Sequence, residues 1–143
     1  MTLRRAVFFA NPSRPEAVNA AGELAALLAA ENFEIVSPTE VSIPGVTSVS
    51  VDAIGDVEIA VVLGGDGTIL RGAEVTLLRD IPLLGINLGH VGFLAEVEKP
   101  SLAATAESII NKTYVHENRM VLGYNVIRNG EEISQGWALN EIT

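Results

Sequence analysis

The feature that most restricts how this chain can fold is a continuous apolar run that ends in a pair of glycines. Residues 58–63 are apolar after the first position, do not alternate with polar residues, and lead directly into Gly64 and Gly65. An apolar run without alternation is typical of a central parallel strand that is covered on both faces. The chain has 143 residues, of which 48% are hydrophobic, and this is enough to bury a core around such a strand.

Strand and helix patterns alternate on both sides of this run. Further strands are predicted at residues 6–10, 33–36 and 82–86, and helices at residues 15–31 and 102–110. Another predicted helix carries on one face Ile69, Leu70, Ala73 and Leu77. Residues 37–50 show neither period and are predicted to form a loop. The alternation predicts an α/β fold, with an open, mostly parallel sheet flanked by helices.

The pattern changes after Tyr114. Residues 120–127 and 133–139 are strand-like and are joined through Asn129-Gly130, which is a strong signal for a β-hairpin. We therefore predict an α/β nucleotide-binding domain at residues 1–113 and the start of an antiparallel β-rich second domain at residues 114–143. Because an isolated hairpin is only marginally stable in water, we expect the chain to end inside this second domain.

Charge and composition exclude several classes of function. Nine basic against eighteen acidic residues give a net charge of -9, which opposes binding to a nucleic-acid backbone. No apolar run approaches the roughly 20 residues that a membrane-spanning helix needs. The absence of cysteine excludes disulfides and Cys-type zinc sites, and we expect a cytoplasmic location. Any phosphate site must therefore be local and depend on backbone N–H groups, one or two arginines and a divalent cation.

Residues 64–68, with the sequence Gly-Gly-Asp-Gly-Thr, lie between the predicted central strand and a helix. Open α/β sheets bind ligands at this position, because glycines allow close approach of the backbone and the first N–H groups of a helix have no internal partners. We predict a phosphate-binding loop made by Gly64, Gly65 and Thr68. Arg71 is spaced to reach back over the same loop. The alternative is a tight turn in which Asp66 caps the helix.

Two common phosphate-binding motifs do not match this loop. It lacks the Gly-Lys-Ser/Thr ending of a P-loop, and Leu70 occupies the place of the third glycine in G-x-G-x-x-G. A dinucleotide bound here would therefore be a substrate and not a hydride carrier.

Two further motifs complete a resemblance to a known family. Residues 85–94 read GINLGHVGFL, and residues 138–141 read ALNE. Together with Gly-Gly-Asp-Gly-Thr, and in this order, they resemble the NAD kinase family of the bacterial type. The resemblance extends over almost the whole chain. It implies transfer of a phosphoryl group from ATP, or from inorganic polyphosphate, to the 2'-hydroxyl of the adenosine ribose of NAD, which gives NADP.

The resemblance also implies roles for individual residues. Asp66 corresponds to the catalytic aspartate, as a general base or orienting acceptor, or as an organiser of the metal. Gly67 and Arg71 fall at nucleotide-binding positions. Asn140 and Glu141 match the pair that holds the adenosine portion, and their hydrogen-bonding groups suit that role.

The other aromatic and imidazole side chains carry weaker signals. Phe93 matches an aromatic residue that stacks on adenine in the family, although its position between Gly92 and Leu94 is also typical of a core residue. His90 and His116 have no second histidine at metal-ligand spacing, and we assign them no catalytic role.

The resemblance implies Mg²⁺ as cofactor, bound mainly through ATP and without a direct protein ligand. It implies NAD and either ATP or polyphosphate as substrates, and a homodimer or homotetramer for the complete protein. Since the family has a further β-rich region after the Asn-Glu motif, we expect little or no kinase activity from this chain alone.

Two alternatives to the NAD kinase interpretation remain open. Lipid kinases of the diacylglycerol or sphingosine type, and sugar-phosphate kinases, share the Gly-Gly-Asp-Gly-Thr turn. The residues that follow the next strand, Asn87-Leu88-Gly89-His90, favour NAD as the substrate. A non-catalytic nucleotide-binding module is the alternative from a different class.

Overall fold

The computed structural model describes residues 3–38, 42–87, 97–98, 102–114 and 121–139. Its larger sheet has six strands in the order β3-β2-β1-β4-β5-β6, and every neighbouring pair is parallel. These strands are β1 (Arg4–Ala10), β2 (Phe33–Pro38), β3 (Thr47–Val49), β4 (Ile59–Leu63), β5 (Leu83–Asn87) and β6 (Val97–Glu98). The predicted open, parallel α/β sheet is confirmed.

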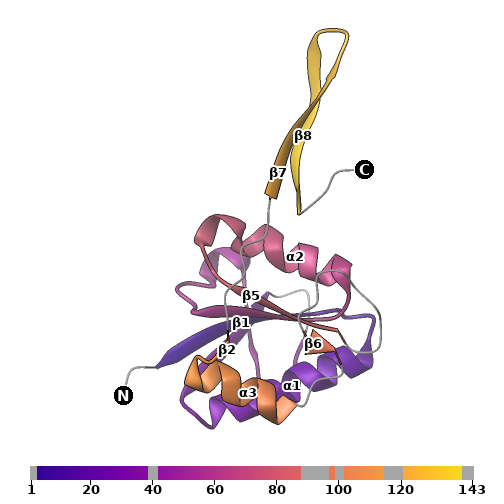
Figure 1. Ribbon diagram of the computed structural model, residues 1–143. Coiled ribbons are helices and arrows are strands. Elements are labelled where there is room, and N and C mark those ends of the chain that lie inside the picture. The colour runs from indigo at the N-terminus through magenta and orange to yellow at the C-terminus, as the bar shows by residue number, and fades with distance from the viewer. Residues whose placement is uncertain (1–2, 39–41, 88–96, 99–101, 115–120, 140–143) are drawn as a thin grey trace.

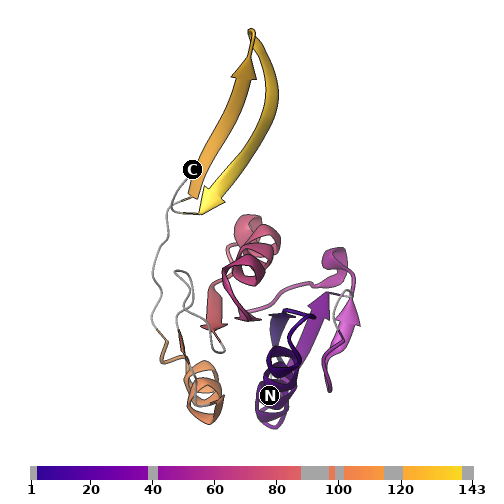
Figure 2. The ribbon, with the colours of Figure 1, turned by 90° about the vertical axis from the view of Figure 1, so that its right-hand side faces the viewer.

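Helices cover both faces of this sheet. They are α1 (Pro15–Ala29), α2 (Asp66–Thr76) and α3 (Leu102–Asn111), with short 3-10 turns η1 (Val51–Ala53) and η2 (Leu77–Arg79). Figures 1 and 2 show α2 on one side of the sheet and both α1 and α3 on the other. Among the described residues, no helix is both long enough and apolar enough to cross a lipid bilayer.

The side chains of β4 explain why its sequence is apolar without alternation. Ile59, Val61 and Leu63 pack in the core cluster formed with α1 and α3. Ala60 and Val62 point to the opposite face and pack in the cluster that contains Ile69 of α2. All five residues of the strand are at most 2% exposed. Successive side chains of a strand point to opposite faces, so a strand covered on both faces must be apolar at every position.

Helix α2 lies unusually close to the sheet at Gly72. A Cβ atom at this position would lie 2.7 Å from Cγ2 of Val62 and 3.3 Å from Cδ1 of Leu83. The predicted apolar face of this helix is partly wrong, because Ile69 is buried whereas Leu70 is 38% exposed. The absence of a side chain at Gly72, and not only the apolar stripe, therefore determines how the helix packs.

The predicted loop at residues 37–50 is also partly wrong. Strand β2 continues to Pro38, and the three-residue strand β3 pairs with it in parallel, with Val36 opposite Thr47. Strand β3 is an edge strand whose residues are exposed or half-buried, so it has no apolar pattern to reveal it. The two-residue strand β6 is the other edge strand of this sheet, and its residues were not predicted as a strand.

The predicted hairpin is confirmed. Strands β7 (Val121–Arg128) and β8 (Glu131–Leu139) pair in antiparallel register and form a separate two-stranded sheet (Figure 1). Asn129 and Gly130 have φ angles of 54° and 81°, as expected for the two central residues of a type I′ turn. The division into domains at residue 113 stays a prediction.

At the amino end of the sheet, Arg4 joins three strands and a helix. Its guanidinium donates to the Glu58 carboxylate before β4, with Nε 2.9 Å from Oε2, and to the carbonyl oxygen of Ile110 at 2.7 Å. It also lies 4.4 Å from the centroid of the Phe33 ring in β2. Arg4 therefore connects the start of the sheet to the carboxyl end of α3.

Candidate functional site

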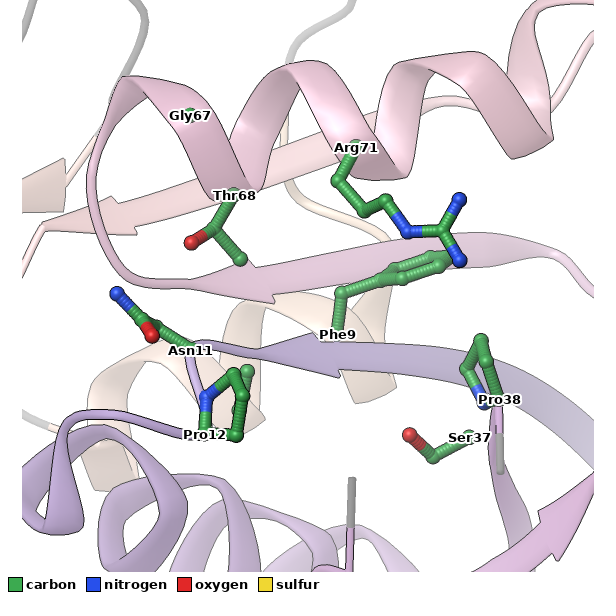
Figure 3. A pocket seen from close by; sticks show the side chains of 9 residues that line it. Phe9, Asn11, Pro12, Ser37, Pro38, Gly67, Thr68 and Arg71 are labelled. Carbon is green, nitrogen blue, oxygen red and sulfur yellow. The ribbon is translucent and has the colours of Figure 1, made fainter. Parts of the chain in front are cut away.

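A pocket of about 370 Å³ lies where β1 and β2 end and α2 begins (Figure 3). Its lining combines apolar side chains with a few polar groups. The lining residues are Phe9, Ala10, Asn11, Pro12, Ser37, Pro38, Gly67, Thr68 and Arg71. This size and composition suit a small organic ligand.

The strand order explains why the pocket forms here. From β1 the chain continues outward to β2 and β3, then returns across the sheet to β4 on the other side of β1. Connections therefore run in opposite directions from the middle of the sheet. In open α/β sheets this switch point leaves a crevice at the carboxyl ends of the strands, and ligands bind there.

The glycine-rich loop is held against the ends of neighbouring strands. The Gly64 N–H donates to the carbonyl of Ile86 at 3.0 Å, and the Asn11 N–H donates to the carbonyl of Leu63 at 3.2 Å. Gly64 has a φ of 154°, and a Cβ atom there would lie 2.8 Å from Oγ1 of Thr68. Only glycine fits at position 64, because both the backbone conformation and the nearby hydroxyl exclude a side chain.

Helix α2 begins at Asp66, and Gly65 occupies the N-cap position without a side-chain hydrogen bond to the helix. Asp66 is therefore the first helical residue, and the N-cap position that the alternative assigned to it is occupied by Gly65. A glycine at the N-cap has no side chain that could bond to the first N–H groups of the helix, which are the groups that bind anions at helix N-termini. Together with the helix dipole, these groups favour an anion at the start of α2.

Arg71 lies one turn further along α2 and lines the same pocket as Gly67 and Thr68. Figure 3 shows its side chain extending from the helix across the pocket towards Phe9. Its Nη1 atom is 3.6 Å from Oε2 of Glu74, and its side chain is 44% exposed. The structure therefore brings together the loop and the arginine, as their spacing predicted.

The other predicted site residues do not line this pocket or lie outside the described residues. Gly64 and Gly65 shape the loop but do not line the pocket. Phe93, Asn140 and Glu141 lie outside the described residues, and their predicted roles remain predictions.

The part of the pocket that β1 and β2 provide was not predicted from the sequence. Asn11 and Pro12 follow β1, while Ser37 and Pro38 end β2, so all four lie at the carboxyl edge of the sheet. The Ser37 hydroxyl donates to the carbonyl of Phe8 at 2.8 Å and is buried. A signal was present, since a polar residue followed by proline occurs at the end of both strands.

Within the described ranges, no group of three or more His, Cys, Asp or Glu residues is arranged to hold a metal ion. The polar side chains of the pocket are an arginine, an asparagine, a serine and a threonine. This set suits an anionic or hydrogen-bonding ligand better than a bare cation.

An open parallel sheet with a ligand pocket at its switch point defines an α/β protein of the nucleotide-binding type. Comparison with known families identifies one family within this class. Residues 6–114 match the ATP-NAD kinase N-terminal domain, and the chain belongs to this family. The match favours the NAD kinase interpretation over lipid and sugar-phosphate kinases that share the glycine-rich turn.

Similar proteins cover only part of this chain, and the chain covers only part of them. It is 54% identical to an NAD kinase of Corynebacterium glutamicum over 65 residues, which is 45% of this chain and 22% of that protein. It is 46% identical to NAD kinase 2 of Streptomyces coelicolor over 61 residues, which is 43% of this chain and 20% of that protein.

A solved structure with the same fold is that of yeast NADH kinase in complex with NADH. The TM-score is 0.72 at 19% sequence identity, and the match covers 96% of this chain and 47% of the yeast chain. The chain thus spans about half the length of this relative.

Proposed function

We propose that this chain forms the nucleotide-binding part of an NAD kinase. The reaction transfers the terminal phosphoryl group of ATP, or of inorganic polyphosphate, to the 2'-hydroxyl of the adenosine ribose of NAD and produces NADP. One observation carries the proposal: Gly67, Thr68 and Arg71 surround one pocket at the switch point of the sheet, in a chain of the ATP-NAD kinase family.

The start of α2 and Arg71 supply the positive potential that a chain of phosphates requires. N–H groups in the first turn of α2 bind phosphate oxygens, and the dipole of the helix adds to this attraction. The Arg71 guanidinium is always charged and suits planar or phosphate ligands. Because the protein has a net charge of -9, its binding of phosphate depends on this local positive potential.

Asp66 carries the chemical role in this proposal. Phosphoryl transfer proceeds through a loose transition state, so positioning and charge neutralisation matter more than a strong base. The carboxylate of an ionised aspartate can accept the hydrogen bond of the ribose hydroxyl. It acts either as that acceptor or by organising Mg²⁺ through water.

The remaining roles complete the proposal. Asn140 and Glu141 hold the adenosine portion of NAD, and Phe93 stacks on its adenine. Mg²⁺ binds mainly through the phosphates of the donor and neutralises their charge. A cytoplasmic location and assembly into a homodimer or homotetramer are further parts of the same prediction.

The test is NADP formation from NAD and MgATP by a form of the protein extended at its carboxyl end to the length of its relatives. We expect Asp66→Asn to lower kcat by about 100-fold or more, because the hydroxyl loses its acceptor. Asp80→Asn is a matched control, since Asp80 is exposed, follows η2 at the far end of α2, and has a φ of 53° that asparagine also tolerates. Equal activity of the two variants would contradict the role of Asp66.

A further inference from the structure

We propose that Asn129 is a site of spontaneous chemical modification, at which the side-chain amide is lost and aspartate or isoaspartate forms. The site lies in the turn that joins β7 to β8 at the tip of the hairpin (Figure 1). This inference depends on the hairpin alone and goes beyond the function proposed above.

The reaction uses only the polypeptide and water. The backbone nitrogen of Gly130 gives up its proton and forms a bond to Cγ of Asn129, while the bond from Cγ to the side-chain nitrogen breaks. That nitrogen takes up a proton and leaves as ammonia, so a cyclic succinimide remains. Water then opens the ring at either carbonyl, which gives aspartate or, where the main chain now runs through the side chain, isoaspartate.

The sequence favours this reaction at one asparagine. Asn129 is the only asparagine in the chain that is followed by glycine. Glycine has no side chain to hinder the approach of its nitrogen to Cγ, and a Cβ atom built at Gly130 would meet nothing within 4 Å. Asn11, by contrast, is followed by proline, whose nitrogen has no proton to lose. The attacking nitrogen is therefore least hindered at Asn129.

The turn is open to solvent. Asn129 and Gly130 are both exposed, as are their neighbours Arg128 and Glu131. Gly130 lies outside the pairing of the two strands, because the last pair of the ladder joins Arg128 to Glu131. Water can therefore reach both the amide that is lost and the ring that must be opened.

Few backbone pairs hold the tip of the hairpin. The register shifts between Val126 and Ile127, so only the pairs Ile127–Glu132 and Arg128–Glu131 lie between this irregularity and the turn. The attack on Cγ requires the backbone to rotate out of the turn conformation. A short, exposed segment with few pairs opens at a low cost in free energy. Local opening of the tip therefore supplies the reactive conformation without unfolding of the chain.

The two products affect the hairpin differently. Aspartate leaves the main chain unchanged, and Asp-Gly also suits a type I′ turn. It adds one carboxylate, so the net charge changes from -9 to -10. Isoaspartate adds a methylene group to the main chain. The turn then no longer matches the strands, and the pairs Ile127–Glu132 and Arg128–Glu131 are lost.

The test is to incubate this chain at mildly alkaline pH and to follow each asparagine by peptide mapping and mass spectrometry, with fragmentation that distinguishes aspartate from isoaspartate. We expect Asn129 to convert first and to give both products. The rate should rise about tenfold for each pH unit, because the attacking nitrogen must lose its proton. Asn32 is a matched control in the same sample, since it also has a positive φ, of 66°, but precedes Phe33, which is 5% exposed. Asn32 should remain intact while half of Asn129 converts. Faster conversion at Asn32, or at any other asparagine, would overturn the proposal.

A variant and a peptide test the roles of Gly130 and of the turn. Gly130→Asn keeps a residue that tolerates the φ of 81° but places a side chain beside the attacking nitrogen. We expect Asn129 in this variant to remain intact over the time in which half of the parent chain converts. A synthetic peptide of residues 126–133 is too short to form the hairpin and should convert up to about tenfold faster than the folded chain. Equal conversion of Gly130→Asn and the parent, or full conversion of the peptide while Asn129 stays intact in the chain, would overturn the proposal.

Discussion

Two glycines in α2 serve different purposes, although the sequence alone does not distinguish them. At Gly72 a Cβ atom would lie 2.7 Å from Val62, whereas at Gly67 it would meet nothing within 4 Å. Gly72 therefore allows close packing of the helix on the sheet. Gly67 is not required by packing, and it lines the pocket.

This difference predicts opposite effects of the same substitution. Gly72→Ala should lower the free energy of unfolding by about 1–3 kcal/mol, because the new methyl group overpacks the core. Gly67→Ala should leave stability unchanged or raise it by up to about 1 kcal/mol, because alanine favours helix more than glycine does. Gly67→Ala should nevertheless weaken ATP binding, since its methyl group occupies the approach of the phosphates.

Urea unfolding of both variants measures the stability, and calorimetric titration of Gly67→Ala with MgATP measures the affinity. An equal loss of stability in the two variants would show that Gly67 also serves packing. Unchanged ATP affinity in Gly67→Ala would contradict a phosphate site at the start of α2.

At the residue scale, the sequence predicted the half of the pocket that α2 provides. The glycine-rich turn and Arg71 are close in sequence, so helix geometry alone places them together. Phe9 and Ser37 could not be predicted, because their position depends on the parallel register that aligns β1 with β2 and β4. The resemblance supplied Phe93, Asn140 and Glu141, which physical reasoning from spacing would not have selected.

At the scale of elements, Arg4 connects β1 to the end of α3. Its guanidinium donates to the carbonyl oxygens of Ile109 and Ile110, and pairs with the Glu58 carboxylate. The hydrogen bond to Glu58 is the main cause that raises the pKa of Arg4 above its ordinary value, so the side chain stays charged. Burial, followed by the charge of Glu58, raises the pKa of the Tyr114 phenol just beyond the helix.

We predict that Arg4→Met lowers the free energy of unfolding by about 1–3 kcal/mol, because Glu58 and the last carbonyl groups of α3 lose their donor. Arg4→Lys should lose less, since an ammonium still pairs with Glu58 but cannot make the same set of hydrogen bonds. Urea unfolding measures the stability. Hydrogen exchange should show faster exchange of the Lys112 and Thr113 N–H groups, which bond to carbonyls of α3. Unchanged exchange in Arg4→Met would mean that α3 ends in the same way without the arginine.

The elements that could be predicted are those with a strong apolar pattern. Strands β1, β4 and β5, the three helices and the β7–β8 hairpin all follow from periodicity or turn chemistry. Strands β3 and β6 have three and two residues and are held by backbone pairing, which leaves no trace in the side chains. The fold was therefore predictable in its centre and not at its edges.

At the scale of the whole molecule, the described structure consists of an α/β sheet with its pocket and a separate hairpin. The proposed function requires a second set of residues, Asn140 and Glu141, to hold the acceptor against the start of α2. The chain contains these residues but spans about half the length of its yeast relative, so we expect little or no turnover from this chain alone and activity from the extended form.

The most direct measurement is to identify the product that forms from NAD and MgATP, by ³¹P NMR and mass spectrometry, with this chain and with the extended form. We expect the extended form to produce NAD with one additional phosphate on the 2'-oxygen of the adenosine ribose, and this chain to produce little or none. Absence of this product from the extended form would contradict the proposed function. Efficient formation by this chain alone would contradict the requirement for further residues to complete the site.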